Sequence, residues 1–429
     1  MANLKFGCFG DDFTGASDAA SFIKKAGLKT ILLNNVPAED FVIPEDTEAV
    51  VIALKIRTIP VAEAVDAALK ACDWLLKQGA HHLYYKYCST FDSTDEGNIG
   101  PITDAIMEKY NLSSTILCPA LPVNGRQVRN GHLYVNGIPL HETHMRFHPL
   151  TPMKSSSIPE LMSKQGKYKC VVLTKEELET QNATALKLFA DSLNQKVYFV
   201  PDYNDEEDAI NIAKLFHDAK FLTGGSGILT ELCKHCSCAE QAASVAKNDE
   251  PRTSRALLLA GSCSAVTLKQ IQCFAANGGN LVKINPQDLF ACEAAPTEVL
   301  EQLWEKVQAL NTPSILLYSS AEPEQVAAMQ DKYGKEAVSS RLEQLMAKMA
   351  LKATHAGWQK IIVAGGETSG AVTEALEAPG YEIGAEIAPG VPIMYPLGKG
   401  GLQLALKSGN FGSENFFNEA IAMMNGDKQ

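Results

Sequence analysis

Short apolar runs alternate with amphipathic stretches along this 429-residue chain, and the alternation constrains the fold more than any other feature. Runs of strand length are KTILL, AVVIALK, HLYYKYC, TILCPA, CVVLT, KVYFV and FLTGG. Helical stretches such as PVAEAVDAALKACDWLLKQG separate several of them. Strands that alternate with helices in this way favour an α/β fold with largely parallel sheets.

A polar stretch interrupts this pattern and predicts a domain boundary. Residues 241–254 lose apolar character and contain a proline, and strand-length runs then resume with ALLLAG, NLVKI, SILLYSS and KIIVAGG. A long helix is expected near residues 334–356, before the last of these runs. We therefore predict an N-terminal domain over 1–240, a linker over 241–254 and a C-terminal domain over 255–429.

Charge and composition exclude several classes of partner. The chain carries 38 basic and 50 acidic residues, a net charge of −12, and has no basic cluster to follow a phosphate backbone, so nucleic acid is not an expected partner. No signal peptide opens the sequence and no run reaches the roughly 18 apolar residues of a membrane span. We expect a cytoplasmic protein whose 11 cysteines are reduced thiols.

Two adjacent carboxylates, Asp11 and Asp12, end the first predicted strand in FGCFGDDFTGASDAA. Ligands of open parallel sheets gather at the carboxyl ends of strands, and Gly15 and Ala16 leave room for one. Because successive side chains of an extended segment diverge, only one carboxylate is expected to face a substrate. We predict that Asp12 does so while Asp11 caps or braces the turn; the alternative is that the pair only caps the following helix.

Cations and hydroxyls follow other predicted strands. Lys55 and Arg57 come after AVVIAL, and Lys86 comes after HLYY. The loop KYCSTFDSTDEGN supplies further polar side chains at Ser89, Thr90, Asp92 and Ser93. Since an arginine can fork onto a carboxylate, this edge is expected to bind a small, hydroxylated, anionic molecule.

Arg126 follows another predicted strand, in a loop that continues into a predicted hairpin, CPALPVNGRQVRNGHLYVNGIPL. The sequence leaves open whether its guanidinium contacts a ligand or the neighbouring backbone. A second open case is CKHCSC, where Cys233, His235, Cys236 and Cys238 have spacings that can hold zinc. One continuing helix cannot aim all four at an ion, so we expect no metal there.

Glycine turns in the second half indicate a nucleotide. KIIVAGGETSGAVTEAL is strand, turn and helix, and its turn places Gly365, Gly366, Glu367 and Thr368 where backbone N–H groups can bind phosphate. LAGSCSAVTLKQI repeats this arrangement at Ser262 and Ser264, and KSGNFG gives a further turn at Gly409. Neither a GxGxxG nor a Walker A motif occurs, since GLQLALKS has Leu406 in place of the required glycine. Ordinary turn chemistry is the alternative for each segment alone.

Seven segments together resemble the four-carbon acid sugar kinase family, most closely the branch that acts on 3-oxo-tetronate. They are GDDFTGASDAASF, KYCSTFDSTDEGNIGP, ALPVNGR, TGGSG, GSCS, GGETSG and KSGNFG. The resemblance implies an N-terminal substrate domain, a C-terminal ATP domain and an active site in the cleft between them. It also implies phosphoryl transfer from ATP, which enters with Mg²⁺, to the 4-hydroxyl of the acid.

Site residues follow from the resemblance and from the strand ends together. The family's ATP contacts fall on Ser262, Gly365 to Thr368 and Gly409, and the neighbouring turn adds Ser264. The expected substrate-binding residues are Asp11, Lys55, Arg57, Lys86, Ser89 and Arg126. Asp12 and Asp92 are the candidates that orient the hydroxyl or accept its proton.

Other functions stay open at this level. The substrate could be D-threonate or erythronate, which differ from 3-oxo-tetronate only in oxidation state or stereochemistry. A different class would be a non-catalytic sugar-acid binding protein, although a second set of glycine turns argues against it. An oxidoreductase is not favoured, because the sequence contains no dinucleotide-binding motif. An aldolase would need a lysine that forms a Schiff base, and no feature of the sequence singles out Lys86 for that role. The oligomeric state is not predicted, with a homo-oligomer as one option.

Overall fold

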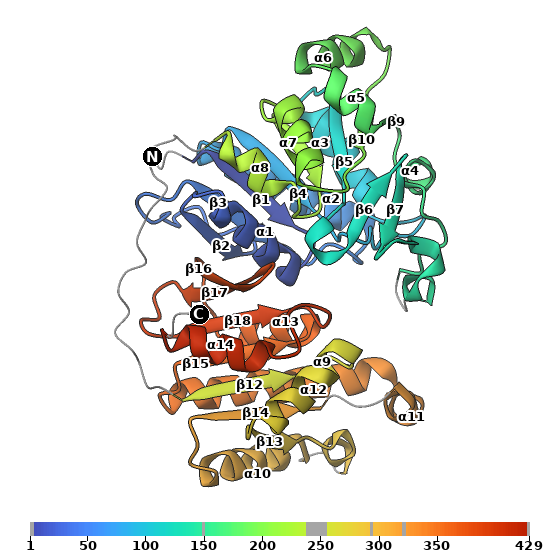
Figure 1. The fold of residues 1–429 in the computed structure, drawn as a ribbon. Coiled ribbons are helices and arrows are strands. Elements are labelled where there is room, and N and C mark those ends of the chain that lie inside the picture. Colours follow the sequence, from blue (N-terminus) through green and yellow to red (C-terminus); the bar gives the residue numbers. More distant parts are fainter. Residues whose placement is uncertain (1–3, 148–150, 237–254, 292–294, 320–322, 427–429) are drawn as a thin grey trace. The chain divides into compact units, whose positions relative to one another are not determined.

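The computed structural model describes residues 4–147, 151–236, 255–291, 295–319 and 323–426. The chain folds into two compact units, Met1–Ser244 and Val245–Gln429 (Figure 1). Each unit is an α/β structure built on a mostly parallel sheet, so the predicted fold class is confirmed. The predicted linker, 241–254, lies outside the described residues.

The sheet of the N-terminal unit has the order β2, β3, β1, β4, β11, β5, β10, β9, and its pairings are parallel. All seven runs predicted here as strands form strands. The strands are β1 (Phe6–Gly10), β2 (Thr30–Asn34), β3 (Ala49–Ala53), β4 (His82–Lys86), β5 (Ser114–Cys118), β9 (Lys169–Leu173), β10 (Val197–Pro201) and β11 (Phe221–Gly224). Every residue of β1 and β3 is buried, as expected for central strands covered by helices on both faces.

Helices of this unit pack on the sheet through small side chains. On α2, Ala64, Ala68, Ala71 and Leu75 recur every three or four residues and are buried, whereas the opposite face is exposed. The helices are α1 (Phe13–Lys25), α2 (Val61–Lys77), α3 (Ile99–Lys109), α4 (Ile158–Gln165), α5 (Lys175–Thr180), α6 (Ala183–Ser192), α7 (Glu206–Phe216) and α8 (Leu229–Lys234).

The predicted hairpin is also present. Strands β6 (Arg126–Arg129) and β7 (His132–Val135) pair antiparallel, and β8 (Ile138–Pro139) extends this small separate sheet. Asn130 and Gly131 make the turn with φ of 49° and 71°, which is the left-handed backbone that an Asn-Gly hairpin turn requires. The hairpin therefore begins at Arg126, one of the predicted site residues.

The sheet of the C-terminal unit has the order β13, β14, β12, β15, β18, β17, β16 (Figure 1). Pairing is parallel from β13 to β18 and antiparallel from β18 to β16. The strands are β12 (Ala256–Ala260), β13 (Asn280–Lys283), β14 (Ser314–Tyr318), β15 (Lys360–Ala364), β16 (Gly380–Ala388), β17 (Val391–Pro396) and β18 (Gln403–Lys407). The antiparallel part was not predicted; β16 and β17 are joined by only two residues, a connection that parallel strands cannot make.

The helices of the C-terminal unit include the predicted long helix near 334–356, which is α12 (Lys335–His355). The others are α9 (Ala265–Ala276), α10 (Ala295–Ala309), α11 (Pro323–Tyr333), α13 (Gly366–Ala375) and α14 (Phe416–Met424). Within the described residues, no helix has both the length and the apolar character needed to cross a membrane.

Candidate active site

The carboxyl edge of the N-terminal sheet gathers most of the predicted substrate residues. The strand register aligns Gly10 with Ala53 and with Lys86, so β1, β3 and β4 end level with one another. The ladder continues one step further, because the Asp11 N–H donates to the Lys86 carbonyl at 3.0 Å. Loops that leave three adjacent strands at one level bring their first side chains together.

Arg57 lies at the centre of this edge. Its Nε and Nη2 donate to the two carboxylate oxygens of Asp11 at 2.9 and 2.8 Å, a bidentate pair. Nη2 also contacts Oδ2 of Asp12, and Nη1 lies 3.8 Å from Oδ2 of Asp92. The bidentate face of Arg57, which we expected to bind a ligand carboxylate, is therefore bound to Asp11. Of the three guanidinium nitrogens, Nη1 has the longest of these contacts.

Asp12 is the N-cap of α1. Its Oδ1 accepts hydrogen bonds from the Gly15 N–H and from the Thr14 hydroxyl, while its Oδ2 contacts Arg57. Two expectations are thus wrong: Asp12 rather than Asp11 caps the helix, and the two carboxylates converge on one guanidinium. The reason is the reach of Arg57. The Asp11 N–H still continues the ladder and the Asp12 backbone is extended, yet one guanidinium contacts both carboxylates, and Asp12 is the residue directly before α1.

Burial and charge separate the two aspartates. The Asp11 side chain is 3% exposed, and desolvation raises its pKa despite the opposing effect of Arg57. The Asp12 side chain is 31% exposed, and although desolvation acts in the same direction, Arg57 and Lys86 outweigh it and lower the pKa of Asp12. Asp12 is therefore the more accessible carboxylate of the pair, and the one whose ionised form its surroundings favour.

Lys86 is the last residue of β4, and its side chain is buried. Its ammonium donates to the Tyr87 carbonyl at 3.0 Å and lies 3.7 Å from Oδ2 of Asp18. A methyl group on Gly15 would lie 3.1 Å from Lys86 Nζ and 3.0 Å from Asp12 Oδ1. A side chain at position 15 would thus crowd Lys86 and Asp12, and the approach of a ligand to Gly15 stays a prediction.

Asp18 was missed in the sequence analysis. It is buried on α1, and its neighbours Ala16, Ser17, Ala19 and Ala20 are buried with it. A carboxylate within a run of small, buried helical residues is a readable signal, because a buried charge needs a partner.

The loop after β4 turns Asp92 toward this cluster. Thr90 donates to Oδ1 of Asp92 at 2.6 Å, and Ser93 donates to the Gln165 amide oxygen at 3.2 Å. Between them Phe91 is fully buried and has φ of 55°, a left-handed conformation that costs a bulky residue about 1–3 kcal/mol. Such strain persists where surrounding structure fixes it, and here it accompanies the approach of Asp92 to Arg57.

Arg126 lies within electrostatic reach of Asp92 and Cys88. Its Nη1 donates to the Asn124 carbonyl, but its buried Nε has no hydrogen-bond partner within the described part of the chain. Desolvation lowers the pKa of Arg126, against the opposing effects of Cys88 and Asp92. A buried donor of this kind costs free energy until an acceptor reaches it.

Lys55 and Ser89 are the remaining predicted substrate residues. Lys55 is exposed, whereas Leu54 and Ile56 on either side are buried. Ser89 is half-buried in the turn before Thr90. Both stay predictions.

The carboxyl edge of the C-terminal sheet gathers the predicted nucleotide residues in the same way. The register aligns Ala260, Ala364 and Lys407, the last residues of β12, β15 and β18. The Gly365 N–H donates to the Lys407 carbonyl at 2.9 Å, and the Ser262 N–H donates to the Ala364 carbonyl at 3.2 Å. The turns after these three strands therefore lie side by side.

Close packing explains two glycines of these turns. A methyl group on Gly261 would lie 2.1 Å from the Thr368 hydroxyl oxygen. One on Gly409 would lie 2.2 Å from the Ser262 hydroxyl oxygen and 3.1 Å from that of Ser264. The structure thus brings Ser262, Ser264, Thr368 and Gly409 together, with one turn packed on the next.

The N-terminus of α13 differs from that of α9. Ser264 caps α9 by accepting from the Thr267 N–H at 3.1 Å. In contrast, α13 has Gly365 as its N-cap, with φ of 134° and no side-chain cap, and Gly366 and Glu367 are exposed. An uncapped helix start with its N–H groups open to solvent suits an anion.

Lys407 was not singled out from the sequence, yet it is fully buried beside these turns. Its ammonium donates to the carbonyls of Ser408 and Gly409, each at 3.0 Å, and to the Thr267 hydroxyl at 3.3 Å. Burial lowers the pKa of Lys407 to about 7. A lysine at the end of an otherwise apolar strand, QLALK, was the available signal.

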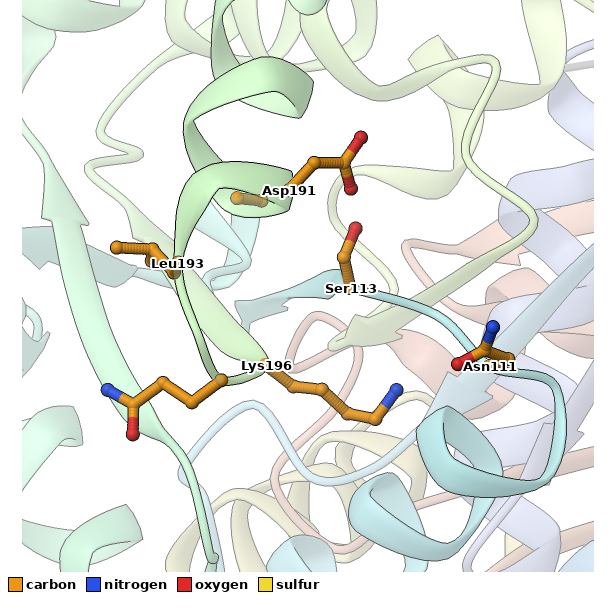
Figure 2. Close-up of a pocket in the computed structure, with 7 residues that line it drawn as sticks. Asn111, Ser113, Asp191, Leu193 and Lys196 are labelled. Carbon is orange, nitrogen blue, oxygen red and sulfur yellow. The ribbon is translucent and has the colours of Figure 1, made fainter.

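A cavity of about 310 Å³ lies elsewhere, at the amino edge of the N-terminal sheet. Figure 2 shows Ser113, Asp191 and Lys196 around it, from the segments before β5 and β10 and from α6. Because Asp11 and Asp92 follow the carboxyl ends of strands, this cavity is not the predicted site.

The cysteine cluster gives no metal site in the described residues, where no three His, Cys, Asp or Glu side chains are arranged to hold an ion. Helix α8 ends at Lys234, before Cys236, so the predicted continuous helix is shorter than expected. Cys238 lies outside the described residues.

Two family models match the chain, one in each unit, and their descriptions name different ligands. Residues 6–232 match the family model described as a sugar-binding N-terminal domain, and residues 257–417 match that of a nucleotide-binding C-terminal domain. A curated Brucella melitensis relative named 3-oxo-tetronate kinase is 40% identical, over 99% of this chain and 98% of its own. A Salmonella typhimurium relative of the same name is 39% identical, over 96% of this chain and 98% of its own.

Solved structures show the same architecture. A Salmonella typhimurium protein superposes with a TM-score of 0.85 at 38% identity, covering 97% of this chain and 98% of its own. A Haemophilus influenzae protein gives a TM-score of 0.78 at 36% identity, covering 97% and 100%. The chain therefore belongs to the four-carbon acid sugar kinase family, in the group whose curated members are named 3-oxo-tetronate kinase, as its motifs indicated.

Proposed function

We propose that this chain is an ATP-dependent kinase that phosphorylates the 4-hydroxyl of 3-oxo-tetronate, giving 3-oxo-tetronate 4-phosphate in acid-sugar catabolism. The observation that carries the proposal is 39–40% identity to the two relatives of that name over nearly the whole chain. The division of charged and glycine-rich edges between the two units supports it.

The acid is assigned to the carboxyl edge of the N-terminal sheet. Arg126 is the cation proposed for the substrate carboxylate, because its buried Nε lacks an acceptor among the described residues while the fork of Arg57 is filled by Asp11. Lys86 and Arg57 hold the carboxylates in place, and Asp11, Lys55 and Ser89 complete the proposed substrate set.

Asp12 and Asp92 are proposed to orient the 4-hydroxyl. During transfer, the bond from the γ-phosphorus to the bridging oxygen of ADP breaks and a bond to the substrate O4 forms, while the hydroxyl proton passes to a carboxylate. Phosphoryl transfer needs positioning more than a strong base. The ionised, partly exposed Asp12 suits that role, and its cap on α1 fixes its direction.

ATP is assigned to the turns of the C-terminal sheet, at Ser262, Ser264, Gly365, Gly366, Glu367, Thr368 and Gly409. Mg²⁺ is proposed to enter with the nucleotide. No three carboxylate, histidine or cysteine side chains among the described residues are arranged round an ion, so phosphate oxygens and water would supply most of its ligands. A cytoplasmic location and the domain limits 1–240 and 255–429 remain parts of the proposal.

A coupled assay tests the function directly. ADP release would be followed with 3-oxo-tetronate, D-threonate and erythronate at equal concentrations, with the product identified by mass and by the position of its phosphate. The proposal expects the highest kcat/KM for 3-oxo-tetronate. A higher value for either other acid would reassign the substrate, and tight binding of an acid without ADP release would indicate a binding protein.

A further inference from the structure

Lys407 lies in a setting that makes two opposing demands on its charge. Its side chain is fully buried, and the groups around its nitrogen are the Ser408 and Gly409 carbonyls, the Thr267 hydroxyl of α9 and, at 5.8 Å, the ring of Phe416 on α14. None of these groups is negatively charged. Burial without an acidic partner disfavours the ammonium.

Hydrogen bonding makes the opposite demand. The Thr267 hydroxyl donates its own proton to the Gly409 carbonyl at 2.9 Å, so toward Lys407 it acts as an acceptor. Three acceptors then lie round one nitrogen, although the Gly409 carbonyl also accepts from the Thr267 and Ser264 hydroxyls. These oxygens accept a stronger hydrogen bond from an ammonium than from a neutral amine.

Charged side chains on neighbouring elements do not resolve this conflict. Lys269 of α9 and Glu414, before α14, are exposed and pair with each other at 3.2 Å. Glu419 of α14 accepts from Ser413, and Glu367 of α13 is exposed. The balance at Lys407 is therefore close, in line with its pKa of about 7.

We propose that nucleotide binding at this edge is coupled to uptake of one proton by Lys407, which acts as a positioning residue for the turn at Ser408 and Gly409. The inference rests on the proposed nucleotide site. Phosphates at the Gly365 turn would add the negative charge that the buried amine lacks, and the amine would take its proton from solvent. The resulting ammonium holds Gly409 against Ser262 and Ser264.

Calorimetric titration of ADP into the whole chain at pH 8 tests this coupling. In a series of buffers with different enthalpies of ionisation, the slope of the observed enthalpy gives the number of protons taken up. With a free-state pKa of about 7, most Lys407 is neutral at pH 8, so uptake should approach one proton per ADP. The affinity of the wild type should also fall as pH rises from 7 to 9.

Two variants of Lys407 and one control variant test whether the proton uptake on ADP binding depends on this lysine. Lys407→Met and Lys407→Arg cannot gain a proton in this range, so both should lose the uptake, and Lys407→Arg should bind ADP with an affinity that varies little with pH. Lys360→Met removes a buried lysine at the amino end of β15 and should keep the uptake. If Lys407→Met does not fold, Lys407→Arg alone decides the test.

The outcomes distinguish a failure of the role of Lys407 from a failure of the proposed nucleotide site. Absence of uptake in the wild type, or equal uptake in the wild type and Lys407→Arg, would overturn the role of Lys407 while leaving the nucleotide site intact. Absence of ADP binding to the wild type would overturn the proposed nucleotide site itself.

Discussion

Lys86 and Lys407 occupy equivalent places in the two units and differ in what surrounds them. Each is the last residue of its strand, is buried, and donates to the carbonyl of the next residue at 3.0 Å. Lys86 lies 3.7 Å from the Asp18 carboxylate and beside Asp12, whereas Lys407 faces carbonyls and a hydroxyl. A lysine at the same place in a strand is thus charge-balanced in the N-terminal unit, whereas in the C-terminal unit no acidic partner faces it from the residues that the structure describes.

This difference shows how each edge is suited to its ligand. The N-terminal edge carries its own balance of carboxylates and cations, which suits a substrate read by hydroxyls and a single carboxylate. The C-terminal edge has a buried lysine without a described acidic partner and an uncapped helix start at Gly365, both of which favour incoming negative charge.

The largest expected effect is that of Asp12→Asn. Asparagine keeps an N-cap oxygen, but the charge that pairs with Arg57 and lies beside the reacting hydroxyl is lost, so a moderate fall in melting temperature should accompany the loss of activity. We expect kcat to fall about 10²- to 10⁴-fold in an assay with saturating ATP and acid. Retention of more than about a third of wild-type kcat would show that Asp12 only caps α1.

Asp11→Asn is the matched comparison. It leaves the Arg57 fork without its charged partner, so thermal or urea unfolding should show a loss of about 3 kcal/mol in the free energy of unfolding. Its kcat should fall less than that of Asp12→Asn. The reverse order of effects on kcat would exchange the roles of the two aspartates.

Arg126→Ala sharpens the comparison on the substrate side. Loss of a charge-assisted hydrogen bond of about 1.5–3 kcal/mol should raise KM for 3-oxo-tetronate about 10- to 100-fold, with little change in KM for ATP. Arg129→Ala is the control, because Arg129 is exposed on the same hairpin and donates to Asn204 and Gln127. Equal KM values for the two variants would remove Arg126 from the site.

A smaller effect, on the pH dependence of the free energy of unfolding, distinguishes Lys407 from Lys86. The pKa of Lys407 is lowered to about 7 in the folded chain, so between pH 7 and about 10 the unfolded chain binds more protons there and the folded state gains stability as pH rises. That gain is at most about 1.4 kcal/mol per pH unit. Comparison of wild type with Lys407→Met isolates it, because other groups titrate alike in both.

Urea unfolding followed by tryptophan fluorescence measures this difference, since Trp304 and Trp358 report on the C-terminal unit and Trp74 reports on the N-terminal unit. The wild type should gain stability over Lys407→Met as pH rises from 7 to 9. Lys86→Met, which removes the cation facing Asp18, should instead destabilise by about 3 kcal/mol. A constant difference between wild type and Lys407→Met across this range would contradict the contrast.

Much of the fold follows from periodicity alone. The alternation of apolar and amphipathic runs predicted the parallel strands and the helix at Lys335–His355, because each strand covered on both faces reads as one apolar run. The antiparallel strands β16 and β17 were missed, since alternating burial over Gly380–Ala388 lacks a long apolar run.

The candidate site was predicted at the level of strand ends and not of side-chain partners. Neighbouring strands in the sheet order placed Asp12, Arg57 and Lys86 together, as the sequence analysis expected. The occupation of Arg57 by Asp11 and the cap made by Asp12 depend on where β1 stops, to within one residue. Pattern reasoning does not resolve that boundary.

The most direct test of the central claim measures two ligands on two variants by calorimetry. Gly366→Val places a branched side chain at the open start of α13, and Arg126→Ala removes the proposed carboxylate partner. We expect Gly366→Val to lose most of its affinity for ADP and to keep its affinity for the acid, and Arg126→Ala to lose affinity for the acid and keep it for ADP. Loss of both ligands in both folded variants, or of neither, would contradict the assignment of the acid to the N-terminal edge and the nucleotide to the C-terminal edge.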